Sequence, residues 1–298
     1  MTHSRAVIYM SVGALFFAIT GEFVHGLSDS ISWQTALLAR GGFGLMVALV
    51  IAHRELRNFP LWHRGSWLRS IGGTFYLALL YYTIQHMPPA EALAITNTRP
   101  LWIAILSFVF LRLALKWQFW PAVLSAFIGS LLLSGLTLSS QMGLIWVAFI
   151  AAGCGSLGYF AIDYCRDISA PVVVVHMSLG LFIGGLILVL WGGIGVQLSK
   201  VHTLTDISLL IGLGVVGTFY HYFVTIAIQA LGSVSGSVAG LLTAIFAYGL
   251  DFLLWNYGFD IYHLIGIIMI LLPAFYIATG HSLVKPRKLS NRKKSATA

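Results

Sequence analysis

Ten apolar stretches run through the 298-residue chain, each about long enough for a helix to cross a bilayer. Short polar or charged segments separate them, a pattern that predicts an all-α integral membrane protein. The expected spans are 5–26, 32–52, 66–86, 89–111, 117–136, 141–164, 170–192, 205–229, 233–255 and 260–281. Hydrophobic residues make up 58% of the chain and charged residues only 9%, whereas a soluble domain carries about 25% charged residues. The composition therefore excludes a water-soluble fold.

The two halves of the chain repeat each other. The motif Gly73-Thr74-Phe75-Tyr76 recurs as Gly217-Thr218-Phe219-Tyr220, and at the same spacing Ile84-Gln85 recurs as Ile228-Gln229. Five spans separate the copies, so the second copy enters the membrane from the opposite side. We expect two inverted five-helix repeats, residues 1–137 and 138–282, and a basic cytoplasmic tail at 283–298. Such repeats place a substrate site where they meet, which favours transport over chemistry.

Basic residues gather on one side of the predicted spans. With the N-terminus inside, the cytoplasmic segments hold Arg5, Arg54, Arg57, Arg64, Arg69, Arg112, Lys116, Arg166, Lys285, Arg287, Lys288, Arg292, Lys293 and Lys294. Lys200 is the basic residue of the outer loops. This positive-inside pattern predicts cytoplasmic N- and C-termini in the cell (inner) membrane. It also accounts for the net charge of +8 without a nucleic-acid partner. The basic tail is interpreted mainly as a determinant of topology, with contact to anionic headgroups of membrane lipid as the weaker second interpretation.

One stretch carries a family resemblance. The segment Tyr81-Tyr82-Thr83-Ile84-Gln85-His86-Met87-Pro88-Pro89-Ala90-Glu91-Ala92 continues into Thr96-Asn97-Thr98-Arg99-Pro100-Leu101-Trp102. It resembles the junction of the third and fourth helices in the EamA-like, ten-helix form of the drug/metabolite transporter superfamily. The resemblance implies secondary transport by alternating access, with spans one to four and six to nine around a central cavity. The ninth span has Ala244 where the repeat would place a second proline.

Arg99 is the leading candidate for substrate binding. A charge at the bilayer centre costs at least about 2.5–3.5 kcal/mol, so it needs a partner or a purpose. Arg99 lies about 15 Å deep in the fourth span, and Pro100 loosens the helix directly after it. Trp102 shares its face and can stack on a ligand or on the guanidinium. We predict that Arg99, Arg40 and Trp102 bind an anionic or zwitterionic group, with a structural ion pair as the alternative for Arg99.

Six further residues complete the predicted site. Tyr76 and Tyr220 are related by the repeat, and they either line the cavity or pack. The candidates for proton coupling or charge pairing are Glu22, Asp251, His176 and His221. Glu22 is placed to pair with Arg40, and histidine titrates near physiological pH, although a hydrogen-bonded helix contact explains the histidines equally well. Two arginines against two or three carboxylates favour a zwitterion such as an amino acid.

An enzyme is the less favoured interpretation. Asp163 and Asp251 are expected on opposite sides of the membrane, so they do not form an intramembrane aspartyl protease. The sequence has no H-E-x-x-H metal motif and no G-x-S-x-G nucleophile motif. We expect no catalytic residue, metal or cofactor. The predicted function is secondary active transport, preferentially export, of a small polar metabolite such as an amino acid or organic anion. The alternative is an intramembrane enzyme or lipid-handling protein, and proton or exchange coupling and oligomeric state stay open.

Overall fold

The computed structural model describes residues 1–58, 60–87, 89–112, 114–134, 142–192, 203–255, 258 and 260–284, and these residues form helices without a strand. The first half contains α1 (His3–Gly26), α2 (Trp33–Ile51), the short 3₁₀ helix η1 (Leu56–Asn58), α3 (Arg64–His86), α4 (Pro89–Thr96), α5 (Arg99–Leu111) and α6 (Phe119–Ser134). The second half contains α7 (Met142–Ile162), α8 (Ala170–Trp191), α10 (Leu204–Leu231), α11 (Ser233–Ala239), α12 (Leu242–Trp255) and α13 (Ile261–Ala278). The predicted all-α class is confirmed. The predicted division at 137/138 and the tail 283–298 fall almost wholly outside the described residues.

Eight stretches of the described chain are helical, long and apolar enough to cross a membrane. Two more of the predicted spans correspond to helices that miss these limits. The helix α3 has 23 residues but is too polar, since it carries arginine, serine, threonine and tyrosine side chains along its length. The helix α6 is apolar but short. The count of ten spans therefore stays a prediction, with α3 and α6 as its third and fifth members.

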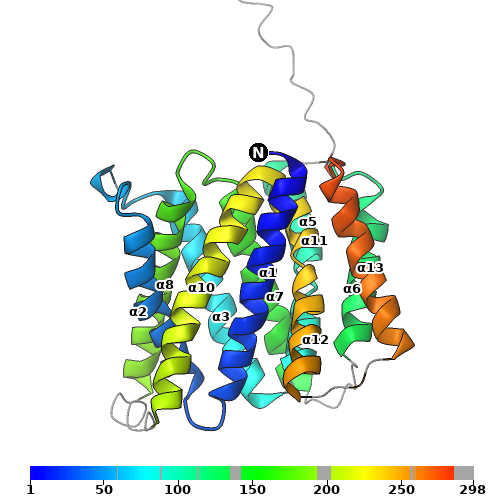
Figure 1. Ribbon diagram of the computed structural model, residues 1–298. Coiled ribbons are helices and arrows are strands. Elements are labelled where there is room, and N and C mark those ends of the chain that lie inside the picture. Colours follow the sequence, from blue (N-terminus) through cyan, green and yellow to red (C-terminus); the bar gives the residue numbers. More distant parts are fainter. Residues whose placement is uncertain are drawn as a thin grey trace, which may run out of the picture.

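The helices stand side by side and run alternately up and down (Figure 1). The N-terminus lies at the end drawn uppermost, which we call the upper end, and the opposite side is the lower end. The described C-terminal residues return to the upper end, because the Ser4 hydroxyl donates to the Ala278 carbonyl at 2.9 Å. An isolated antiparallel bridge joins Leu115 and Val284 nearby. Both ends of the described chain therefore lie on one side of the bundle.

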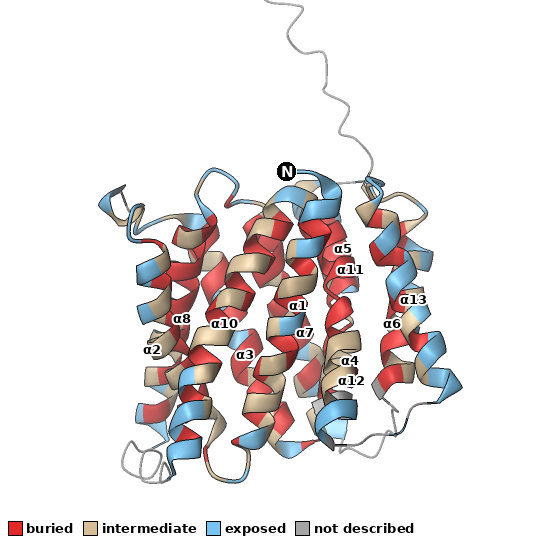
Figure 2. Ribbon diagram, in the orientation of Figure 1, coloured by how far each residue is buried: buried red, intermediate tan, exposed pale blue. Residues whose placement is uncertain are grey.

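Helices from the two halves pack against each other in pairs. The closest pairs are α1 with α10, α3 with α7, α2 with α8, and α6 with α13. Buried residues concentrate where these pairs meet, while α6 and α13 stand to one side of the bundle (Figure 2). Gly129 and Gly266 let these two helices touch, since a Cβ on either would come within 2.8 Å of the other's carbonyl oxygen. The core is thus shared between the halves.

Two spans are interrupted near their middle, whereas the sequence predicts uninterrupted helices at 89–111 and 233–255. The first breaks between Thr96 and Arg99, and the second between Ala239 and Leu242. Pro100 explains the first break, because a proline lacks the N–H that would bond the carbonyl four residues back, at Thr96, and its ring crowds that carbonyl. The second break has no proline but falls beside Gly240, a poor helix former. Both interruptions expose helix ends inside the bundle.

Candidate functional site

Eight polar or aromatic side chains form one connected group in the middle of the bundle, which we call the arginine–tyrosine cluster. Its members are Arg40, Arg69, Tyr76, Tyr81, Arg99, Tyr159, Tyr220 and His221, from α2, α3, α5, α7 and α10. No member is more than 5% exposed. Burying three guanidinium groups is costly, so the contacts that each one makes decide what the cluster is for.

Arg40 and Arg69 meet at the ring of His221. The Arg40 guanidinium donates to the Tyr81 hydroxyl at 3.0 Å and lies 3.5 Å from Nε2 of His221. Nδ1 of the same ring is 3.2 Å from the Arg69 guanidinium. A guanidinium only donates, and a neutral imidazole has one acceptor nitrogen, so His221 can accept from one arginine but not from both. The cluster therefore has more donors at this point than acceptors.

Arg99 lies between aromatic rings. Its guanidinium carbon is 5.1 Å from the ring centroid of Tyr76 and 5.1 Å from that of Tyr159, within the range of cation–π attraction. Tyr159 also faces Arg69 at 5.8 Å and shares a 3.1 Å hydrogen bond with the hydroxyl of Tyr220. The tyrosines thus provide polarizable surfaces for the arginines but leave their charge uncompensated.

Glycines make the space for the guanidinium groups. A Cβ on Gly217 would lie 2.5 Å from the guanidinium carbon of Arg40. A Cβ on Gly158 would lie 3.1 Å from Nη1 of Arg69. These are closer than ordinary van der Waals contact, so a larger residue at either position would displace an arginine. The repeated glycine of the Gly-Thr-Phe-Tyr motif thus has a definite role in the second half.

The cluster is short of acceptors as well as of negative charge. Nε of Arg40, Nε of Arg69 and the hydroxyl of Tyr76 are buried without a hydrogen-bond partner among the described residues. The ion pairs of the described chain are His63–Asp167, Arg166–Asp163 and His263–Asp260, and none of them includes a cluster arginine. Buried polar groups are normally paired, and orphans need an explanation. An anion bound in the cluster would supply the missing acceptors.

The structure brings five of the predicted site residues together and separates the others from them. Those in the cluster are Arg40, Arg99, Tyr76, Tyr220 and His221. Trp102 is half-buried and packs on Phe149, with ring centroids 5.2 Å apart, so the rings at Arg99 are Tyr76 and Tyr159 instead. Glu22 is half-buried in the last turns of α1 and is not among the contacts of Arg40. The side chain of Asp251 lies outside the described residues.

Arg69 corrects the sequence analysis. The positive-inside pattern assigned it to the cytoplasmic segments, but it lies one and a half turns into α3, is 4% exposed and reaches His221. In a sequence, a basic residue near a predicted helix start can be either an anchor at the membrane interface or a group buried in the bundle. The signal that separates them is the run of small residues on its face, since Gly72 and Gly73 allow α3 to approach other helices closely. Tyr81 and Tyr159 had no distinguishing signal among the chain's 12 tyrosines.

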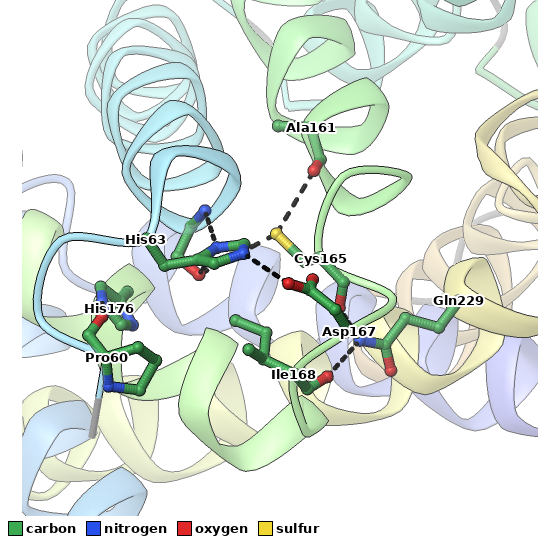
Figure 3. A network of polar contacts seen from close by, with 9 residues as sticks. Pro60, His63, Ala161, Cys165, Asp167, Ile168, His176 and Gln229 are labelled. Atoms are coloured by element: carbon green, nitrogen blue, oxygen red, sulfur yellow. Dashed lines mark hydrogen bonds and ion pairs between the residues drawn. The ribbon is translucent and has the colours of Figure 1, made fainter. Parts of the chain in front are cut away.

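His176 contacts the α2–α3 connection and not the cluster, and Figure 3 shows it beside Pro60. Its Nδ1 is 2.9 Å from the Val172 carbonyl and its Nε2 is 3.1 Å from the Pro60 carbonyl, so it ties α8 to the α2–α3 connection. Nearby, the Gln229 side chain donates to the backbone carbonyls of Cys165 and Ile168. These hydrogen bonds hold helices to neighbouring connections. They agree with the interpretation of His176 as a hydrogen-bonded helix contact.

An apolar groove lies away from the cluster. It holds about 600 Å³ between α3, α7 and α8, and apolar side chains such as Phe75, Ile183 and Ile187 dominate its lining. Phe75 and Ile187 are also exposed at the surface of the bundle, where a membrane protein faces lipid. This groove suits hydrocarbon and not a polar metabolite. No group of three or more metal-ligating side chains occurs in the described part of the chain.

Comparison with known proteins identifies the first half of the chain. Residues 4–135 match the EamA-like transporter family, which confirms the resemblance seen at 81–102. Among curated proteins there is no match. One similar solved structure, described only as the crystal structure of a protein, superposes with a TM-score of 0.71 at 17% identity. The match covers 93% of this chain and 96% of the other, so nearly all of the chain shares that fold. The chain is a multi-pass membrane protein.

Proposed function

Because residues 4–135 match the EamA-like transporters of the drug/metabolite transporter superfamily, we propose that this chain is a secondary transporter of a small organic anion. The substrate binds at the arginine–tyrosine cluster, and Arg99 is its principal contact. The observation that carries this proposal is the burial of Arg40, Arg69 and Arg99 in one group, with no carboxylate among their contacts in the part of the chain that the structure describes. A structural core gains nothing from such an arrangement, whereas a ligand site requires it.

The enclosure of the cluster supports alternating access. Every member is nearly inaccessible to solvent, so a ligand reaches the centre only after helices separate at one end. The two interrupted spans place helix ends at this depth, which is a recurring feature of transporter binding sites. Export is the direction that we propose, with exchange or proton coupling as the driving force.

An inverted repeat provides the two matching ends that alternating access needs. At the lower end, Gln85 donates to the Ile31 carbonyl and accepts from the Trp33 backbone N–H, which ties α3 to the α1–α2 connection. At the upper end, Gln229 ties α10 to the α7–α8 connection in the same way. These are the two glutamines of the Ile-Gln repeat. Their equivalent roles at opposite ends support two five-helix units of opposite orientation.

Orientation in the membrane follows from charge. Arg54, Arg57, Arg64 and Arg112 are on connections at or near the upper end, where the N-terminus also lies. We propose that the upper end faces the cytoplasm, as the positive-inside rule requires.

Reconstitution tests the function. Proteoliposomes are loaded with a mixture of organic anions, amino acids and amines, and the external medium is analysed by mass spectrometry over time. We expect wild-type protein to release one or more anions unchanged, and the Arg99→Gln variant to release them at least about tenfold more slowly. Release of chemically altered solutes would indicate an enzyme instead. Equal release by both proteins would exclude Arg99 from the pathway.

A further inference from the structure

We propose that the substrate carries two negative charges on a small frame, as a dicarboxylate or a phosphate does, and that Arg69 is the residue that makes the site selective for it. This inference rests on the proposed function and narrows its substrate class. The sequence alone pointed to two central arginines balanced by carboxylates, hence to a zwitterion. The described residues add a third buried arginine, Arg69, and buried donors that lack acceptors.

The net charge of a ligand decides how well it offsets the positive charge of the three arginines. Guanidinium groups stay protonated in proteins, and the contacts of these three among the described residues are tyrosines and His221, with no carboxylate. A zwitterion adds no net charge and leaves the mutual repulsion of the arginines in place. A monocarboxylate offsets one charge of three. A dianion offsets two, and its several oxygens can accept from more than one guanidinium at once.

The unpaired donors indicate where such a ligand would bind. Nε of Arg40 and Nε of Arg69 are both buried without a partner among the described residues, and these two side chains converge on His221 from either side. The hydroxyl of Tyr76 is a third buried donor in the same state, and its ring contacts Arg99. Three buried donors of the cluster, on Arg40, Arg69 and Tyr76, therefore lack acceptors, which a compact anion with several oxygens would provide.

Local helix geometry adds to the preference. The helix α5 starts at Arg99 within the bundle, so the positive end of its dipole lies beside that guanidinium. No side chain caps this helix start with a hydrogen bond. Pro100 has no N–H, and the Leu101 N–H donates to the Thr98 carbonyl at 3.0 Å, so this helix end favours an anion through its dipole.

Thermal unfolding of the purified full-length protein tests the inference. The probes are succinate, inorganic phosphate, acetate and glycine at matched ionic strength. We expect succinate or phosphate to raise the Tm of the wild type by about 5 °C at concentrations near a hundred times Kd, with smaller shifts for acetate and glycine. Arg69→Met should abolish the dianion shift, and its ligand-free Tm should equal or exceed that of the wild type because repulsion is relieved. Arg64→Met, an exposed arginine on the same helix, should behave as wild type.

Each other outcome has a definite meaning. A shift with acetate or glycine that equals the dianion shift, and that Arg99→Gln removes, overturns the dianion inference while the proposed transport site stands. A dianion shift that survives in Arg69→Met overturns the role of Arg69. A large fall in the ligand-free Tm of Arg69→Met, without any probe stabilising the wild type, makes the cluster structural and overturns both proposals. Arg69→Lys keeps the charge and should retain part of the shift, which separates loss of binding from misfolding.

Discussion

The two halves of the chain share a backbone plan and divide the chemistry unequally. Each half has an interrupted helix near the centre and a glutamine that ties a long helix to a connection at one end. The three buried arginines, however, all come from the first half, and the second half contributes Tyr159, Tyr220 and His221. Thr243 and Leu213 stand where the repeat would place partners for Arg99 and Arg69.

The difference teaches that a symmetric scaffold need not build a symmetric site. The arginines of the first half can bind the anion together, while the aromatic residues of the second half shift relative to them. This also fits the family match, which covers residues 4–135 and so coincides with the half that supplies the arginines. The ends of the bundle, by contrast, need matching clamps if each is to open in turn.

The largest expected effect comes from filling the glycine that accommodates Arg40. In Gly217→Ala the new Cβ would lie 2.5 Å from the guanidinium carbon, and Arg40 must move away from Tyr81 and His221. We expect dianion affinity to fall at least about tenfold, measured by titrated thermal shift.

Gly73→Ala is the matched change in the first half. Its nearest neighbour is the flexible end of Met177, which can rearrange, and Nη1 of Arg69 lies farther away at 3.3 Å, so a smaller loss is expected. Equal losses would remove the asymmetry.

Removal of either glutamine contact should lower the free energy of unfolding by a similar amount. Gln85→Leu and Gln229→Leu each remove two hydrogen bonds and strand backbone groups of a connection. We expect each to destabilise the protein by about 1–3 kcal/mol, measured by thermal unfolding in the same detergent. A difference between them larger than about 2 kcal/mol would mean that the ends are not equivalent.

Cys165 reports on the upper end. Burial raises the pKa of its thiol to about 11, so only about a thousandth of it is thiolate at pH 8. We expect maleimide labelling of Cys165, measured in a Cys154→Ser background, to be slow at pH 8 and to speed up as pH approaches 11. Gln229→Leu should accelerate it by freeing the α7–α8 connection, and Gln85→Leu should not. Acceleration by both variants would show general loosening in place of separate ends.

The smallest effect is expected at the contact between His63 and Asp167. Nδ1 of His63 accepts from the Ser66 backbone N–H, so Nε2 carries the hydrogen that faces Asp167 at 3.3 Å (Figure 3). The Asp167 side chain is 68% exposed, and exposed ion pairs contribute little. Asp167→Asn should therefore change the free energy of unfolding by less than about 1 kcal/mol. A larger loss would mean that this ion pair helps to hold the upper end closed.

Much of the fold could be predicted from the sequence because hydrophobic runs and basic flanks are local signals. The helical spans agree closely with prediction, as with 205–229 for α10. The break at Thr96 could have been placed from Pro100, since the loss of its N–H acts at a fixed distance along the helix. The break beside Gly240 could not, because glycine lowers helix propensity without fixing where a helix ends.

The site was predicted only in part, for a physical reason. An isolated charge such as Arg99 in an apolar run is a strong signal wherever it lies. Arg69 is the sixth residue of α3, so from the sequence it resembles an anchor at the membrane interface, but the packing of α3 on α7 buries it. Trp102 lies one turn after Arg99 in the same helix, α5, but its ring packs on Phe149 of α7, so the rings beside the guanidinium are decided by tertiary packing.

Direct binding is the most immediate test of the account. Isothermal titration of the purified wild type with succinate, or with inorganic phosphate if that gives the larger thermal shift, measures the stoichiometry and the affinity. The account predicts one saturable site per chain that weakens as salt rises and disappears in both Arg99→Gln and Arg69→Met. A wild type without saturable binding, or variants that bind as the wild type does, would contradict the claim that the buried arginines form an anion site.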